Sequence, residues 1–351
     1  MLKIKNDTGE NYMSIFYQIL GKPFRDNALL VRIDTGNSHF RFLFDCGEAV
    51  LSGVGLSEIQ ANDEVFFSHF HTDHIAGFDS FIRANYDRTT KKVRVWGPKD
   101  TLRVLSHRLQ GFTWNLVQNS TAIWEIKEIQ EKSLHSATFY TSEGFFNMHD
   151  CYTEPWEEVI LSSPWFKIKA IPLHHGIPSM GYLVEEKTRW NIDKEKISLL
   201  GLPPGPWLKE VKEYSESSQE KYISIQGKEY SLKELNESLL ISTPGESIAY
   251  LTDFIMDANT QEKLLKFLPK GCTLVCESQY LREDRELAQK NYHLTSEDAA
   301  WIAKNAEAKK LILVHFSQRY EISQVKKLLE DARNIFPETF LPDEWNQYFV
   351  Y

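Results

Sequence analysis

A cluster of metal-ligand residues, His69, His71, Asp73 and His74, constrains this chain more than any other feature. The four residues follow the spacing H-x-H-x-D-H, directly after a short apolar run at 65–67 and before a helical pattern. A loop between a strand and a helix can point all four side chains at one place. Imidazole and carboxylate groups bind zinc, and also manganese or iron. A histidine-rich surface loop is the alternative, but the strand–loop–helix context favours a metal site.

Length and charge bound the fold and the partners. The 351 residues, 42% hydrophobic and 13% aromatic, allow one large domain or two smaller ones with a substantial core. Asp and Glu number 49 and Lys and Arg 40, so the net charge of −9 gives no general attraction to nucleic acid. The stretch between Arg88 and Arg108 is locally basic. It predicts either phosphate contacts or ordinary solvated charges.

The cysteines and the apolar runs indicate the compartment. Four scattered cysteines fit a reduced cytosolic protein better than a disulfide scaffold. Residues 1–7 lack the apolar core of a signal peptide, and no apolar run approaches membrane-spanning length. We therefore expect a cytoplasmic protein without membrane contact.

Further polar residues follow the ends of later strands. His175, Asp253, Glu277 and His315 each come just after an apolar strand pattern, where sites on such sheets usually form. Taken alone, each is more often a structural residue than a ligand. Together with the first motif, His175, Asp253 and His315 complete a set for two metal ions. The expected groups are His69, His71 and His175 for one ion, Asp73, His74 and His315 for the other, and Asp253 between them.

Three segments complete the layout. Strand patterns at 29–34 and 40–44 flank a turn signal at 35–38 and predict a hairpin. Residues 187–246 are polar and carry the run Leu-Pro-Pro-Gly-Pro, which indicates an inserted arm rather than core. Residues 110–165 are rich in aromatic side chains, which either stack RNA bases or, as we favour, pack in the core.

The order of these motifs over nearly the whole chain resembles the metallo-β-lactamase superfamily, and within it the ribonuclease Z family. Supporting stretches are Pro23–Asn27, Leu43–Glu48, His175–Tyr182, Gly201–Pro206, Ala249–Asp253 and His315–Tyr320. The resemblance implies an α/β fold, the αβ/βα four-layer sandwich with two central mixed sheets. It also implies a single domain over 1–351, with the arm as an RNA-binding insertion and a homodimer as the assembly.

The resemblance further implies a metal-dependent phosphodiesterase with two Zn²⁺ ions, for which Mn²⁺ or Fe²⁺ would also suit the donors. Its substrate would be precursor tRNA, cleaved at the 3′ trailer. Asp73 would accept the nucleophile's proton, and Glu277 would orient His293 as proton donor. A residue that only flanks a helix is the alternative for His293. The alternative functions are a hydrolase of a small phosphodiester such as a cyclic nucleotide and a metal-stabilised RNA-binding scaffold without turnover.

Overall fold

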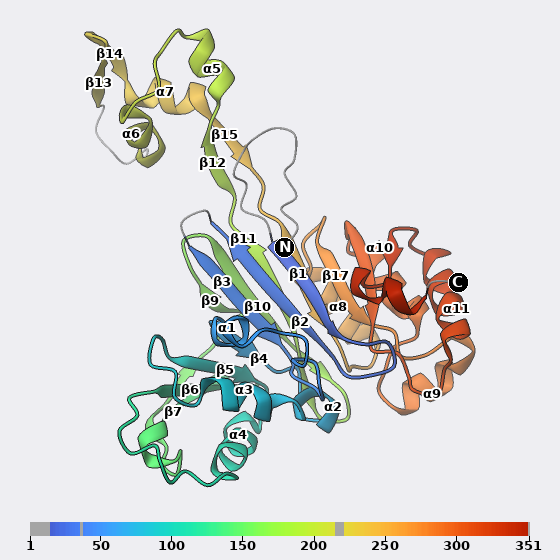
Figure 1. The fold of residues 1–351 in the computed structure, drawn as a ribbon. Helices are drawn as coiled ribbons and strands as arrows, with labels where there is room; N and C mark the ends of the chain where they lie inside the picture. The colour runs from blue at the N-terminus through green and yellow to red at the C-terminus, as the bar shows by residue number, and fades with distance from the viewer. Residues whose placement is uncertain (1–14, 36–37, 215–220, 350–351) are drawn as a thin grey trace. The chain divides into compact units, whose positions relative to one another are not determined.

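The computed structural model describes residues 15–35, 38–214 and 221–349 and contains two compact units (Figure 1). The larger unit comprises the chain up to Glu185 and from Glu246 onward, and the smaller one comprises Glu186–Gly245. The stretch 1–7 and the turn residues 36–37 lie outside the described residues.

The first half of the larger unit forms an eight-stranded sheet in sequence order. Its strands are β1 (Ile15–Gly21), β2 (Asn27–Asp34), β3 (His39–Phe44), β4 (Glu64–Phe66), β5 (Val93–Gly97), β6 (Ile123–Ile129), β7 (Ser133–Tyr140) and β8 (His149–Pro155). Strands β3 to β6 run parallel, whereas β1–β2–β3 and β6–β7–β8 are antiparallel. The predicted hairpin is confirmed, because β2 pairs with β3 from Asp34 and His39 onward.

The second sheet has seven strands in the order β19-β18-β17-β16-β11-β10-β9. They are β9 (Val159–Ser162), β10 (Phe166–His174), β11 (Pro178–Glu186), β16 (Ser247–Leu251), β17 (Thr273–Glu277), β18 (Lys310–Val314) and β19 (Thr339–Phe340). Strands β16 to β19 are parallel, and β11 joins them antiparallel through β16. Carboxyl ends of parallel strands meet at one edge of a sheet, and this edge carries Asp253, Glu277 and His315.

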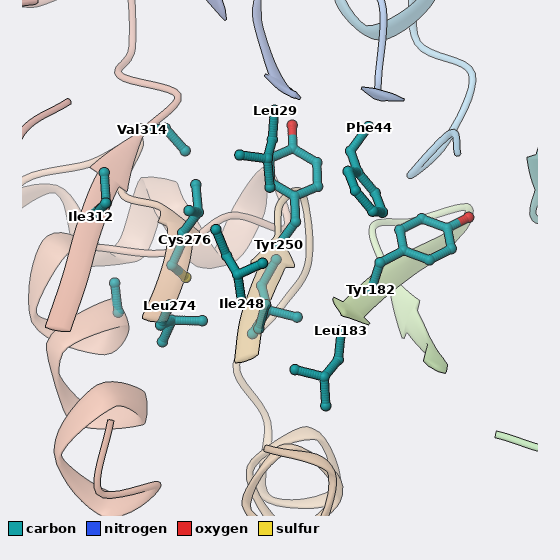
Figure 2. Close-up of a cluster of buried hydrophobic side chains, with 14 of the residues drawn as sticks. Leu29, Phe44, Tyr182, Leu183, Ile248, Tyr250, Leu274, Cys276, Ile312 and Val314 are labelled. Atoms are coloured by element: carbon teal, nitrogen blue, oxygen red, sulfur yellow. The ribbon is translucent and has the colours of Figure 1, made fainter. Parts of the chain in front are cut away.

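The two sheets pack face to face. Alternate residues of a strand point to opposite faces, so Leu29 and Phe44 enter the space between the sheets while Leu30 and Leu43 point the other way. Phe44 lies 5.6 Å from Tyr182 of the opposite sheet, ring centroid to centroid. Figure 2 shows side chains from both sheets in this core.

Helices cover the outer faces. Buried side chains of α1 (Leu56–Gln60), α3 (Phe78–Asn85) and α4 (Thr101–Gln110) pack on the first sheet, and those of α8 (Ala258–Phe267), α10 (Ser296–Asn305) and α11 (Ile322–Arg333) join the core of the second. The short helices are α2 (Thr72–Ile75), α9 (Arg285–Lys290) and the 3-10 turns Thr141–Glu143, Arg282–Asp284 and Asp343–Tyr348. The predicted sandwich of two mixed sheets between helices is confirmed. In the described part of the chain, the helices are too short or too polar to span a membrane.

The smaller unit has its own core. It contains β12 (Arg189–Ile192), α5 (Lys194–Leu199), α6 (Trp207–Glu213), β13 (Tyr222–Ile225), β14 (Lys228–Ser231), α7 (Leu232–Leu239) and β15 (Leu240–Thr243). Strands β12 and β15 pair antiparallel, so the chain leaves and returns side by side. Trp207, Val211 and Leu239 are buried among other apolar side chains of the unit. A hydrogen bond from the Trp207 indole to the Pro203 carbonyl (2.9 Å) holds the proline-rich turn against α6.

Candidate metal centre

The H-x-H-x-D-H motif lies at the end of β4, where the chain turns into α2. His69 is fully buried, and His71 is exposed and begins the helical turn as its N-cap. The backbone N–H of His74 donates to the His71 carbonyl (3.1 Å), which folds the motif back on itself. The ring centroid of His69 therefore lies 4.6 Å from that of His71 and 4.2 Å from that of His74.

Distant strand ends supply the other members. The His175 ring lies 5.1 Å from His69 and 5.0 Å from His71, centroid to centroid. The His315 ring lies 5.3 Å from His74 in the same measure. The predicted groups His69, His71, His175 and Asp73, His74, His315 each place one donor atom per residue within 4.8 Å of the others.

Asp253, the residue expected to bridge, lies close to members of both groups. One of its carboxylate oxygens is 3.2 Å from His74 Nε2 and 3.7 Å from His315 Nδ1. The other oxygen is 3.7 Å from His175 Nε2. A buried carboxylate in this position can reach a cation in either group.

The buried donors fit metal ions. The Nε2 atom of His69 is buried without a hydrogen-bond partner among the described residues, and a cation would satisfy its lone pair. Burial works to lower the pKa of His315, yet the Asp253 carboxylate and a contact with Asp73 raise this pKa to about 10. Burial likewise opposes the charged form of His74, whose pKa Asp253 and Asp45 nevertheless raise well above its usual value. The buried carboxylates thus favour positive charge here, and nitrogen and oxygen donors of this kind suit zinc.

A second carboxylate, Asp45, orients the ligands from behind. It is fully buried at the end of β3 and accepts hydrogen bonds from His74 Nδ1 (2.8 Å), the Ser68 N–H (2.7 Å), the Ser68 hydroxyl (2.8 Å) and the Tyr250 hydroxyl (3.0 Å). A bond at Nδ1 fixes the ring and directs Nε2 toward the centre. We did not predict this role from the sequence, although a carboxylate directly after a strand was a signal for it.

Left-handed backbone conformations gather around the site. Asp45, Asp253, Tyr292 and His315 have φ between 55° and 61°. Residues other than glycine rarely adopt such angles, and they cluster where function requires a strained backbone. At Tyr292 the backbone presents its carbonyl to His175 Nδ1 at 2.8 Å, which fixes that ring.

Glu277 and His293 form the predicted pair. Glu277 is fully buried, and one of its oxygens accepts from His293 Nδ1 at 2.8 Å while the other accepts from the Phe254 N–H at 3.0 Å. Burial raises the pKa of Glu277, but the contacts with His293 and His315 together outweigh it and lower the pKa below its usual value. A ring nitrogen of His293 also lies within 4.8 Å of donor atoms of Asp253 and His175, so these three residues could hold a metal ion together. Because Glu277 occupies Nδ1, the Nε2 atom of His293 remains available to a substrate.

Most of the basic run has partners within the protein. Arg88 is buried and donates to the backbone carbonyls of Gln60, Asn62 and Lys92. Four more side chains pair with nearby carboxylates, namely Lys91, Arg94, Arg103 and Arg108. The contacts of these five residues favour a structural role for the run.

The aromatic segment is divided. Trp124, Phe139 and Phe145 are fully buried in the core between the first sheet and its helices. Phe146 and Tyr152 are exposed. Core packing, the role that we favoured, therefore accounts for three of the largest side chains but not for the whole segment.

Comparison with known proteins identifies the family. A family model described as "Anti-Pycsar protein Apyc1" matches residues 17–182. A protein named Ribonuclease Z from Deinococcus radiodurans is 38% identical over 327 residues, which cover 93% of this chain and 97% of that protein. This chain belongs to the ribonuclease Z family. It is a metal-dependent hydrolase, as the sequence predicted.

Solved structures agree on the fold. The metallo-β-lactamase fold protein YhfI from Bacillus subtilis superimposes with a TM-score of 0.53 at 16% identity, covering 93% of this chain and 95% of that one. The short form of human tRNase Z gives a TM-score of 0.50 at 17% identity, with the same coverage. At such identities these likenesses establish the fold alone.

Proposed function

We propose that this protein is an endoribonuclease that removes the 3′ trailer from precursor tRNA. The observation that carries the proposal is the family membership, which extends over 93% of the chain and includes both the cluster at the strand ends and the smaller unit. The Glu277–His293 pair beside that cluster supports turnover rather than a scaffold role.

We assign two metal ions to the cluster. His69, His71 and His175 would hold one ion, Asp73, His74 and His315 the other, and Asp253 would contact both. Zinc suits these donors best, and Mn²⁺ or Fe²⁺ would also suit them. When bound, such a pair supplies Lewis-acid polarisation of the phosphate and a hydroxide nucleophile near neutral pH.

The remaining chemistry falls to side chains of the protein. Asp73 has a half-exposed carboxylate 3.4 Å from both His74 Nε2 and His315 Nε2. Burial alone would raise its pKa, but hydrogen bonds with His315 and His74 lower it strongly, so Asp73 is ionised, as a metal ligand must be. The further role of Asp73 as acceptor of the nucleophile's proton is proposed from the family resemblance, because a carboxylate with so low a pKa is a weak base on its own. His293, held through Nδ1 by Glu277, would donate a proton from Nε2 to the departing 3′ oxygen. The products would be a tRNA 3′-hydroxyl and a trailer with a 5′-phosphate.

The smaller unit, Glu186–Gly245, is proposed as the arm that grips RNA away from the chemistry, inserted into a single catalytic domain. Its own buried core supports this role, because a unit that folds on its own contacts can present a rigid surface. We further propose a cytoplasmic homodimer. Four unpaired cysteines support the reducing compartment, and the family resemblance supports the dimer. Light scattering of the purified protein tests the dimer.

One experiment tests the function. The protein is incubated with a 3′-extended tRNA and, separately, with bis(p-nitrophenyl) phosphate, and the RNA ends are mapped. Cleavage at the tRNA–trailer boundary that leaves a 3′-hydroxyl is the expected result. An Asp253→Ala variant purified in parallel controls for contaminating ribonuclease. Hydrolysis of the small diester with intact tRNA would reject the proposal in favour of a small-phosphodiester hydrolase.

A further inference from the structure

A cavity of about 530 Å³ opens beside the metal centre, within the larger unit. His174, Gly176 and Ile177, the residues on either side of His175, line it. Its size falls in the range of small-molecule sites, roughly 300–1,000 Å³. A substrate whose phosphate lies at the centre would therefore bring an adjoining group to this cavity.

The cavity has apolar walls. Ile129 and Leu173 are buried in the core between the sheets and present fixed surfaces. Ile177 stands at the rim with 37% of its surface exposed. Apolar side chains in this arrangement can contact the face of a planar ring, and nucleobases bind proteins through such faces.

Polar groups at the cavity edge suit the rest of a nucleotide. Lys99 is exposed, and within the described ranges the structure gives it no carboxylate partner. Most other Lys and Arg side chains of residues 88–108 do have one. Its ammonium group is therefore available to a phosphate in a protein whose net charge is −9. Glu131 also lines the cavity, and a carboxylate can accept hydrogen bonds from ribose hydroxyls.

We propose that this cavity binds the nucleoside next to the scissile phosphate. The base contacts Ile177 at the rim, above the buried Ile129 and Leu173, and the phosphate on the far side of that nucleoside contacts Lys99. The inference rests on the proposed function, since it assumes an RNA substrate, and it makes Lys99 and Ile177 positioning residues rather than members of the reacting centre.

Chromogenic nucleotides test each half of the site. One pair of substrates carries a p-nitrophenyl phosphate on the 3′ or on the 5′ oxygen of thymidine, with a free phosphate on the other oxygen. A second pair lacks that free phosphate, and bis(p-nitrophenyl) phosphate lacks the nucleoside altogether. The 3′ and 5′ forms place the nucleoside on opposite sides of the reacting phosphate. The form whose KM changes more in the variants therefore shows on which side of that phosphate the cavity binds the nucleoside.

Lys99→Ala should raise KM roughly fivefold to tenfold for at least one substrate with the free phosphate, because a partly exposed charged contact is lost. It should leave the substrates without that phosphate unchanged. The matched control is Lys92→Ala, because Lys92 is an exposed lysine of the same run. This variant should leave KM unchanged for substrates with and without the free phosphate.

Ile177→Ala should raise KM for the nucleoside esters with or without the free phosphate, while hydrolysis of bis(p-nitrophenyl) phosphate stays at the wild-type rate. Ile322→Ala, another exposed isoleucine of the larger unit, is its control. Wild-type KM values for every nucleoside ester in both test variants would overturn the proposal. An equal loss on bis(p-nitrophenyl) phosphate would also overturn it, because the variants would then act through the metal centre. Failure of the proposed function is read separately, as wild-type protein that leaves 3′-extended tRNA intact.

Discussion

Replacing Asp45 with Asn should weaken metal binding, although Asp45 itself is no proposed ligand. Its two oxygens accept four hydrogen bonds, from His74, from Tyr250 and twice from Ser68. An Asn side chain keeps the shape but has one NH₂ group, and either orientation turns that group toward a donor. The His74 ring then loses the negative charge behind it, and it also loses its acceptor when the NH₂ group takes the Oδ2 position.

The size of the effect follows from these contacts. Partners that orient metal-bound histidines typically contribute 10- to 100-fold in metal affinity, or about 1.4–2.7 kcal/mol. Asp45 is fully buried and no solvent can replace its bonds, so we expect the upper part of this range. Only one ligand ring is contacted directly, and one ion should therefore be lost before the other.

Competition with a chromogenic zinc chelator measures both affinities. The matched control is Asp63→Asn, because Asp63 accepts from the Arg41 N–H (2.8 Å) and pairs with Lys91 (2.6 Å) without touching the cluster. Asp63→Asn should bind metal like the wild type. Wild-type affinity in a folded Asp45→Asn variant would refute the reasoning that His74 depends on this carboxylate.

Four further predictions follow from the geometry. Metal analysis should find two ions per wild-type chain, and Asp253→Ala should lose both together, whereas loss of a single ion would show that Asp253 does not bridge. His293→Ala should retain both ions and cleave 3′-extended tRNA about 10²–10⁴-fold more slowly, and a normal rate or lost metal would exclude the proton-donor role. Replacing residues 207–240 by a short Gly-Ser linker should abolish tRNA cleavage but spare bis(p-nitrophenyl) phosphate, while equal retention of both activities would exclude the arm as an RNA site. Iodoacetamide should alkylate the exposed Cys151 first, since the other cysteines are buried, and mass spectrometry that finds Cys46 labelled equally fast would contradict this burial.

Patterns that are local in the chain were readable from the sequence. The H-x-H-x-D-H spacing predicted a cluster because one loop and one helical turn suffice to gather His69, His71 and His74. Alternating and continuous apolar runs predicted the strands, and with the family resemblance they predicted the two-sheet sandwich. Residues 187–246, around the proline-rich turn, could be distinguished from the core in the sequence because they are more polar.

Tertiary structure decided what depends on distant contacts. The sequence does not reveal that Asp45 binds Tyr250, 205 positions away, or that the carbonyl of Tyr292 fixes His175. The basic run is an example. From the sequence Arg88 and Lys99 are both expected to be surface charges, but Arg88 donates to backbone carbonyls and Lys99 lines a cavity. Residue type and spacing determine which chemistry a chain can perform. Which groups are buried together, and therefore which charges are compensated within the protein and which remain available to a ligand, is set only when the two sheets pack.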